Sequence, residues 1–442
     1  MRVGVAAIGR PTFDVPFAEE MVGAGMAALG DLPHDLVVHR GLALSPEDAA
    51  AAAEALTAAG VDAAIVLLAT FTDSTLVEPF RAVTDGPLLL WSVPEERTGG
   101  RLRLNSLCGL NLAAYALEGD VRGLYMAPGP DATAHVADLL GAPASDAAPT
   151  GAPITGRGTS PLSGRTVGVI GDPPTGFGPC GYDDDEVAGL LGMTVDRVEL
   201  DDLFDDARGR NGAAVGAAPE GIGELDGGGV ARSYALHRSL RALVEDRGWS
   251  GLATRCWPEC FTDYGSAACA AQGLLADDGI PACCEADVYG SITALLLQEV
   301  LEGPAFVADL VHLDAEDDTA VMWHCGVAAP SLAAGAVGAT VHSNRLQPLL
   351  HEFALKPGPV TLARLSRSPS GHRLVIGEGE MLDRPLPFGG TAGVMQMTRP
   401  VGEVVDLMVS ERLDHHYGLA YGSAADALEA IAEGADLPVV RI

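Results

Sequence analysis

The sequence predicts an α/β protein: two Rossmann-like domains with parallel sheets, followed by a C-terminal domain that is mainly β. Continuous apolar runs of strand length alternate with helical segments up to about residue 334. This alternation is typical of parallel sheets covered by helices on both faces. Beyond that point, short β-like runs are separated by Pro-Gly, Ser-Gly and Gly-Gly turns. The 442 residues suffice for about three domains.

Composition sets the expected domain boundaries. The N-terminal α/β domain is predicted at 1–145, the second α/β domain at 164–334 and the β-rich domain at 335–442. Residues 146–163 are rich in Ala, Pro, Gly, Ser and Thr, which is typical of a linker.

The N-terminal domain is predicted from four apolar strands and the helices between them. Strands are expected at 1–10, 36–39, 62–69 and 87–91, and helices at 17–29 and 46–59. Ser45 precedes the second helix and is a residue type that caps helix N-termini. The loop after the fourth strand carries Arg101, Arg103 and Asn105. These residues could contact an anionic or polyhydroxylated ligand, or the loop could be an ordinary surface loop.

The second domain begins with a strand at 166–170 and a glycine-rich turn. The glycine spacing is not G-x-G-x-x-G and no G-K-[ST] follows, so the sequence argues against a dinucleotide or P-loop site. Strands are also expected at 252–254 and 280–284, with a helix at 266–275 between them. A further strand at 319–323 ends in His324, and we expect it in the same sheet.

Net charge and hydropathy exclude two classes of partner. The formal net charge is −33, whereas nucleic-acid binding needs a basic face. No uninterrupted apolar run reaches the roughly 18 residues of a membrane span, and the first residues read as a strand and a turn rather than a signal peptide.

The eight cysteines form no C-x-x-C pair. Reduced thiols in a cytoplasmic protein are therefore expected.

Two acidic clusters follow the strands at 252–254 and 280–284: Glu259 after the first, and Glu285 with Asp287 after the second. Ligands bind at the C-terminal edge of open parallel sheets, and a carboxylate there must be solvated, paired or bound to a metal. Glu259 and Asp287, or Glu285 instead, are therefore candidate ligands of one divalent cation. The alternative is that Asp287 caps the helix that follows and Glu259 is an exposed loop residue.

Two adjacent histidines, His415 and His416, lie near the end of the chain. Imidazole is a common ligand of divalent cations. On extended backbone the two rings would point in opposite directions, so we expect only one to reach a given site.

The chain resembles the L-fucose/L-arabinose isomerase superfamily, in particular its shorter members. The likeness is carried by T-R-C-W-P-E (254–259), G-I-P-A-C-C-E-A-D-V-Y-G (279–290), W-H-C-G (323–326) and H-H-Y-G-L-A-Y-G (415–422). It implies an aldose–ketose isomerase that uses Mn²⁺ or another divalent cation such as Mg²⁺ or Co²⁺, and that assembles as a homo-oligomer, a hexamer or a trimer. Carried onto this sequence, the ligands are Glu259, Asp287 and one of His415 and His416, with Glu285 as the rival of Asp287. The expected sugar-contacting residues are His324, Trp257, Glu285, Arg101 and Asn105.

The residue types suit this chemistry. Aldose–ketose conversion moves a proton between C1 and C2 through a cis-enediol, which needs a base, an acid and stabilisation of negative charge. A divalent ion that binds both sugar oxygens would supply the stabilisation. We expect Glu259 and Asp287 to move the proton as well as bind the ion. L-Fucose, L-arabinose or a related aldose is the expected substrate; an anionic, sulfonated sugar and a non-enzymatic sugar-binding module are the alternatives.

Overall fold

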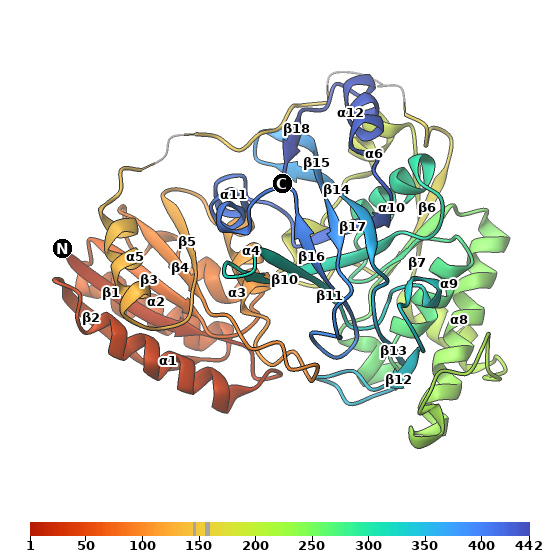
Figure 1. The fold of residues 1–442 in the computed structure, drawn as a ribbon, viewed down its shortest axis with the longest axis horizontal. Coiled ribbons are helices and arrows are strands. Elements are labelled where there is room, and N and C mark those ends of the chain that lie inside the picture. The colour runs from red at the N-terminus through yellow and green to blue at the C-terminus, as the bar shows by residue number, and fades with distance from the viewer. Residues whose placement is uncertain (145–146, 155–159) are drawn as a thin grey trace.

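The computed structural model describes residues 1–144, 147–154 and 160–442 and consists of three sheets with their helices (Figure 1). The N-terminal unit, the nine-stranded sheet and the second α/β unit lie in that order across the view in Figure 1. Two α/β units and one mostly β unit confirm the predicted fold class.

The N-terminal unit is a five-stranded parallel sheet of order β2-β1-β3-β4-β5. Helices α1 and α5 pack on one face, and α2, α3 and α4 pack on the other. Ser45 caps α2 as expected, because its hydroxyl accepts the N–H of Asp48. The elements are β1 (Arg2–Ile8), α1 (Val15–Leu29), β2 (Asp35–Ala43), α2 (Pro46–Ala59), β3 (Ala63–Leu68), α3 (Ser74–Val77), β4 (Leu88–Ser92), α4 (Ser106–Ala116), β5 (Val121–Tyr125) and α5 (Pro130–Gly141).

The second unit is a four-stranded parallel sheet of order β7-β6-β8-β9. Helices α6 and α10 cover one face, and α7, α8 and α9 cover the other. The two strands that precede the acidic clusters are β8 and β9, and they are neighbours in the sheet. The elements are β6 (Thr166–Ile170), α6 (Asp184–Leu191), β7 (Thr194–Val198), α7 (Leu200–Arg208), α8 (Gly227–Arg247), β8 (Gly251–Thr254), α9 (Cys269–Asp277), β9 (Ala282–Cys283) and α10 (Val288–Val300).

The third unit is a nine-stranded sheet of order β12-β13-β16-β11-β10-β17-β14-β15-β18. A further pairing between β15 and β16 closes six of these strands into a ring. The elements are β10 (Phe306–Asp314), β11 (Thr319–His324), β12 (Gly338–Thr340), β13 (Leu350–Ala354), β14 (Gly358–Ser368), β15 (Gly371–Met381), β16 (Thr391–Met397), α11 (Val404–Ser410), β17 (His416–Tyr421), α12 (Ala425–Gly434) and β18 (Val439–Arg441).

The prediction that the strand ending at His324 belongs to the second α/β sheet is wrong. That strand is β11, and it pairs antiparallel with β10 and β16 in the nine-stranded sheet. Both β10 and β11 consist mostly of apolar residues, and such runs do not reveal which sheet they join. The β-rich unit therefore begins near residue 306 rather than 335.

Helix α10 joins the second and third units. Its apolar side chains share one core with β14, β15 and α12. Gly418 of β17 permits this close packing, because a Cβ there would lie 2.8 Å from the Leu297 side chain of α10. The start of α10 is thereby fixed against the strand that begins with His416.

The described part of the expected linker contacts the third unit. Ala152 forms an antiparallel bridge with His372, and Thr150 is hydrogen-bonded to Glu411. The rest of the linker prediction, at 146 and 155–159, lies outside the described residues. Within the residues that the structure describes, we find no helix long and apolar enough to cross a membrane.

Candidate active site

A cavity lies where the three units meet. The N-terminal unit contributes residues that follow β1, β3 and β4, and the second unit contributes the segments after β8 and β9. The nine-stranded sheet contributes Asp309, Trp323, His324 and the segment 342–344. The residues that line the cavity are Arg10, Thr12, Phe13, Phe71, Leu102, Asn105, Phe177, Cys256, Trp257, Phe261, Cys269, Cys284, Glu285, Asp309, Trp323, His324, Cys325, His342, Ser343 and Asn344.

The turn between β9 and α10 directs its two acids to different places. Glu285 and Ala286 both have left-handed backbone, with φ of 60° and 53°. Such conformations are unfavourable for residues other than glycine and are often found at functional sites. After this turn, Glu285 lines the cavity, whereas Asp287 is fully buried at the start of α10.

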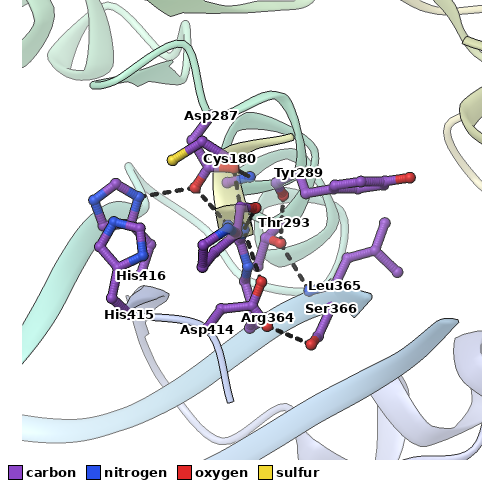
Figure 2. Close-up of polar contacts among 12 residues, drawn as sticks. Cys180, Asp287, Tyr289, Thr293, Arg364, Leu365, Ser366, Asp414, His415 and His416 are labelled. Carbon is purple, nitrogen blue, oxygen red and sulfur yellow. Dashed lines mark hydrogen bonds and ion pairs between the residues drawn. The ribbon is translucent and has the colours of Figure 1, made fainter. Parts of the chain in front are cut away.

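Both carboxylate oxygens of Asp287 are already bound by other residues of the protein. Asp287 accepts the Gly290 N–H as the cap of α10, and it forms an ion pair with buried Arg364, whose Nη1 lies 2.6 Å from Oδ2. The same oxygen lies 2.8 Å from Nδ1 of His416 (Figure 2). Although burial alone would raise the pKa of Asp287, the guanidinium and the imidazole hold it well below its usual range. The helix-cap alternative thus describes Asp287 better than a ligand role.

The two histidines lie side by side, contrary to the expectation of opposite directions. Their ring centroids are 4.0 Å apart, because β17 begins only at His416 and His415 precedes the extended strand (Figure 2). Nε2 of His415 lies 3.1 Å from Oε2 of Glu285, and Nε2 of His416 lies 3.6 Å from the same oxygen. Burial lowers the pKa of His415 to about 3 and also lowers the pKa of His416. Both rings are therefore neutral and able to bind a cation.

Asp309 of β10 completes this cluster. Its Oδ1 lies 3.6 Å from Nε2 of His416, and both atoms are buried without a hydrogen-bond partner within the described chain. Burial raises the pKa of Asp309 to about 6 and also raises the pKa of Glu285. A buried carboxylate, a partly buried carboxylate and an unpartnered imidazole nitrogen are donor types that suit a divalent cation such as Mn²⁺.

Glu285, Asp309 and His416 therefore fit a divalent cation. Asp287 supports this set from behind, because a carboxylate on Nδ1 fixes the tautomer that leaves Nε2 free to bind. Ligand atoms of Cys180, Glu285, His415 and His416 all lie within 4.8 Å of one another, whereas Asp309 is linked to this group through Nε2 of His416. A second group of atoms, from Cys283, Asp287 and His416, has similar spacing. The bonds of Asp287 to Arg364 and Gly290 make that second group the poorer candidate.

His324 lies beside the cluster and lines the cavity, and its contact with a substrate stays a prediction. Its Nδ1 accepts the backbone N–H of Cys325, so Nε2 is the nitrogen that carries the proton. The ring centroid is 5.6 Å from that of His416. His324 can therefore donate a hydrogen bond to a ligand oxygen.

Glu259 does not join the cluster. Both of its oxygens bind the Arg255 guanidinium, at 2.6 and 2.7 Å, and it is not among the cavity-lining residues. It stands at the start of the helical turn Cys260–Tyr264, which directs it toward Arg255 and partly toward solvent. Trp257, two residues earlier, does line the cavity. We therefore replace the pair Glu259 and Asp287 with Glu285 and Asp309.

The three candidate residues in the loop after β4 lie at different positions relative to the cavity. Asn105 lines the cavity with a left-handed backbone, φ 50°. Arg101 lies next to the cavity, where its guanidinium donates to Oδ1 of Asn344 and to the carbonyl of Thr12. Arg103 is directed away and is paired with Asp14.

Sequence reasoning missed Asp309 and Arg364. Each is a buried charged residue with apolar neighbours on its strand, in FVADLVHLD and GPVTLARLSRS. A charge at a buried strand position requires a partner, so this pattern could have identified both.

Comparison with known proteins gives one consistent result. Residues 4–128 match the model of the N-terminal domain of fucose/sulfoquinovose isomerases. The sulfoquinovose isomerase of Alkalicoccus urumqiensis is 32% identical over 392 residues, which cover 86% of each chain. The sulfoquinovose isomerase of Priestia aryabhattai is 30% identical over 431 residues, covering 95% of this chain and 94% of the relative. The sulfoquinovose isomerase of Clostridium sp. (strain MSTE9) is 30% identical over 449 residues, covering 98% and 97%. The chain therefore belongs to the fucose isomerase-like superfamily, the family of the fucose and sulfoquinovose isomerases.

Proposed function

We propose that this protein is a divalent-cation-dependent aldose–ketose isomerase that acts on a sulfonated aldose of the sulfoquinovose type. The observation that carries the proposal is that the free Nε2 of His416 lies 3.6 Å from a carboxylate oxygen of Glu285 and 3.6 Å from one of Asp309, and that these two acids line one cavity. The curated relatives named above are sulfoquinovose isomerases. They favour the sulfonated sugar, which was the alternative from the sequence, over L-fucose or L-arabinose.

Each residue of the cluster has a role in the proposed reaction. Glu285, Asp309 and His416 would hold the ion, and Mn²⁺ or a similar ion would supply charge stabilisation at the sugar oxygens. The carboxylates of Glu285 and Asp309 are the bases nearest the cluster. One of them takes the proton from C2 of the aldose and delivers it to C1, while the proton of the O2 hydroxyl passes to O1, so that the enediol becomes the ketose. His324 donates a hydrogen bond from Nε2 to a sugar oxygen.

The enclosing side chains have a second task. Phe177, Trp257 and Trp323 line the cavity with apolar surface, and Phe177 packs edge-on against His415 at 6.0 Å. Such surroundings limit the water that reaches the proton in transit and strengthen the electrostatic interactions of the carboxylates.

We also propose a homo-oligomer, which light scattering on the purified protein would test.

The proposal is tested by following ketose formation by NMR. Sulfoquinovose, L-fucose and L-arabinose are each supplied with Mn²⁺, and the reaction is repeated in D₂O and after chelation. We expect turnover of sulfoquinovose, deuterium at C1 of the ketose, and loss of activity with chelator that Mn²⁺ restores. Turnover of L-fucose or L-arabinose but not sulfoquinovose would contradict the substrate class. Activity indifferent to chelator would contradict the cation.

A further inference from the structure

Two carboxylates line the cavity, and two arginines lie beside residues of its lining. The carboxylates are those of Asp309, which is buried, and Glu285, which is partly buried. Arg101 is exposed and hydrogen-bonded to the lining residue Asn344, and Arg345 is half-buried and lies over the ring of the lining residue Trp257. In a chain with 60 acidic and 27 basic residues, most arginines should find a carboxylate. Within the described parts of the chain, neither Arg101 nor Arg345 forms an ion pair with one.

Arg345 is a partly buried cation without a counterion. Its guanidinium carbon lies 5.1 Å from the ring centre of Trp257, which lines the cavity. Its Nε is buried without a hydrogen-bond partner in the described chain. Burial lowers the pKa of Arg345. Burying an unpaired charge is costly, so an anionic ligand would relieve an existing penalty here.

The segment that carries Arg345 is held in place before any ligand arrives. The N–H groups of His342 and Leu346 are bonded across the turn, to Gln347 O at 2.9 Å and to His342 O at 2.7 Å, respectively. The side chain of Gln347 donates to the carbonyl of Phe261. A fixed turn lowers the entropy cost of ordering the site when a ligand binds.

Asn344 adds an oriented donor at the same place. Its Oδ1 accepts two bonds from Arg101, at 2.6 and 3.2 Å, so its Nδ2 remains to donate. Asn344 and Ser343 both line the cavity. Arg101 also donates to the carbonyl of Thr12 and thus ties the N-terminal unit to this turn.

We propose that Arg345, together with Asn344 and Arg101, binds the sulfonate of the substrate while the reacting end of the sugar lies at Glu285 and Asp309. The inference rests on the proposed function and adds the residues that select the substrate. A sulfonate near the two carboxylates would be repelled, whereas planar guanidinium groups match its oxygens. A neutral sugar such as fucose gains nothing from these arginines.

The test compares Arg345→Met and Arg101→Met with Arg103→Met. Arg103 is the matched control, because it lies two residues from Arg101 but pairs with Asp14 outside the cavity. The substrates are sulfoquinovose and 6-deoxyglucose, the same hexose without the sulfonate. Melting curves establish that each variant is folded.

We expect Arg345→Met to lower kcat/KM for sulfoquinovose about 10- to 100-fold, mainly through KM, because charge-assisted hydrogen bonds are lost. Arg101→Met should act in the same direction, Arg103→Met should change little, and activity on 6-deoxyglucose should stay within about threefold for all three variants. If wild-type activity on the neutral sugar is too low to measure, the kinetics with sulfoquinovose decide between the outcomes. A higher KM with an unchanged kcat in Arg345→Met then supports the sulfonate site.

The two proposals fail in different ways. A wild-type protein that isomerises neither sugar overturns the proposed function itself. If the wild-type protein isomerises sulfoquinovose and both Arg345→Met and Arg101→Met have the wild-type KM, only the sulfonate site is overturned. Equal losses on both sugars would also overturn it, because the arginines would then serve the fold or the chemistry rather than the sulfonate.

Discussion

At the residue scale, the site depends on acids in different surroundings. Asp287 is neutralised by Arg364 and His416, whereas Glu285 and Asp309 face a cavity without a counter-charge as strong. Burial raises the pKa of Glu285 and Asp309, while the pKa of Asp287 is held low by its partners. The first two carboxylates are therefore available to a cation, and the third supports the histidine.

This difference predicts opposite effects of two similar substitutions. Asp287→Asn should destabilise the cation-free protein by about 3 kcal/mol or more, because it breaks a buried ion pair. Asp309→Asn should leave the cation-free protein as stable as the wild type or more stable, because it removes a poorly compensated buried charge. Melting temperatures measured with and without Mn²⁺ check both, and the rise on adding Mn²⁺ should vanish in Asp309→Asn. A lower melting temperature for cation-free Asp309→Asn than for Asp287→Asn would contradict this assignment.

At the element scale, the start of α10 positions the site. Gly290 is the third residue of α10, and a Cβ there would lie 2.5 Å from Oδ2 of Asp287 and 2.7 Å from Sγ of Cys283. Asp287 could then not keep its contacts with both Arg364 and His416. The glycine is thus required by the close approach of the capping carboxylate.

We predict that Gly290→Ala lowers both the melting temperature and the affinity for Mn²⁺. The matched control is Gly23→Ala within α1, where a Cβ would meet nothing within 4 Å. That change should stabilise the protein by about 0.5–1 kcal/mol through helix propensity. Mn²⁺ titration and melting curves of both variants provide the measurement. Unchanged Mn²⁺ affinity in Gly290→Ala would show that the cap does not hold His416.

Strand pattern predicted the α/β elements, and capping rules offered the cap at Asp287 as the alternative to the expected ligand role. Two features escaped them. The left-handed turn at Glu285 and Ala286 sends neighbouring acids to different partners, and alternation along a strand does not describe such a turn. The apolar strands β10 and β11 pair with distant β17 and β16, and apolar runs alone do not specify partners. Asp309 and its sheet were therefore not connected to Glu285 in advance.

At the scale of the whole molecule, the site requires all three units. The N-terminal unit also supports the histidine segment directly, because buried Asn111 of α4 donates to the carbonyl of Leu413 at 2.7 Å. Leu413 lies just before Asp414, His415 and His416. The two segments are 302 positions apart in sequence, so sequence periodicity gave no sign of this contact.

Asn111→Ala should therefore destabilise the protein by about 1–3 kcal/mol, because it leaves a buried carbonyl unsatisfied, and it should also lower isomerase activity. The control is Asn211→Ala in an exposed loop, which should change stability by less than about 0.5 kcal/mol. Thermal melting and the ketose assay check both variants. Full activity of Asn111→Ala would indicate that the N-terminal unit does not help to position the histidines.

The central claim is that Glu285, Asp309 and His416 hold one divalent cation, and Mn²⁺ binding followed by electron paramagnetic resonance tests it most directly. The proteins to compare are the wild type, Glu285→Gln, Asp309→Asn, His416→Gln and, as the control, Glu259→Gln. We predict one tightly bound Mn²⁺ per chain in the wild type and in Glu259→Gln, and weak or no binding in the other three. Wild-type binding by those three variants, or loss of binding in Glu259→Gln, would contradict the account.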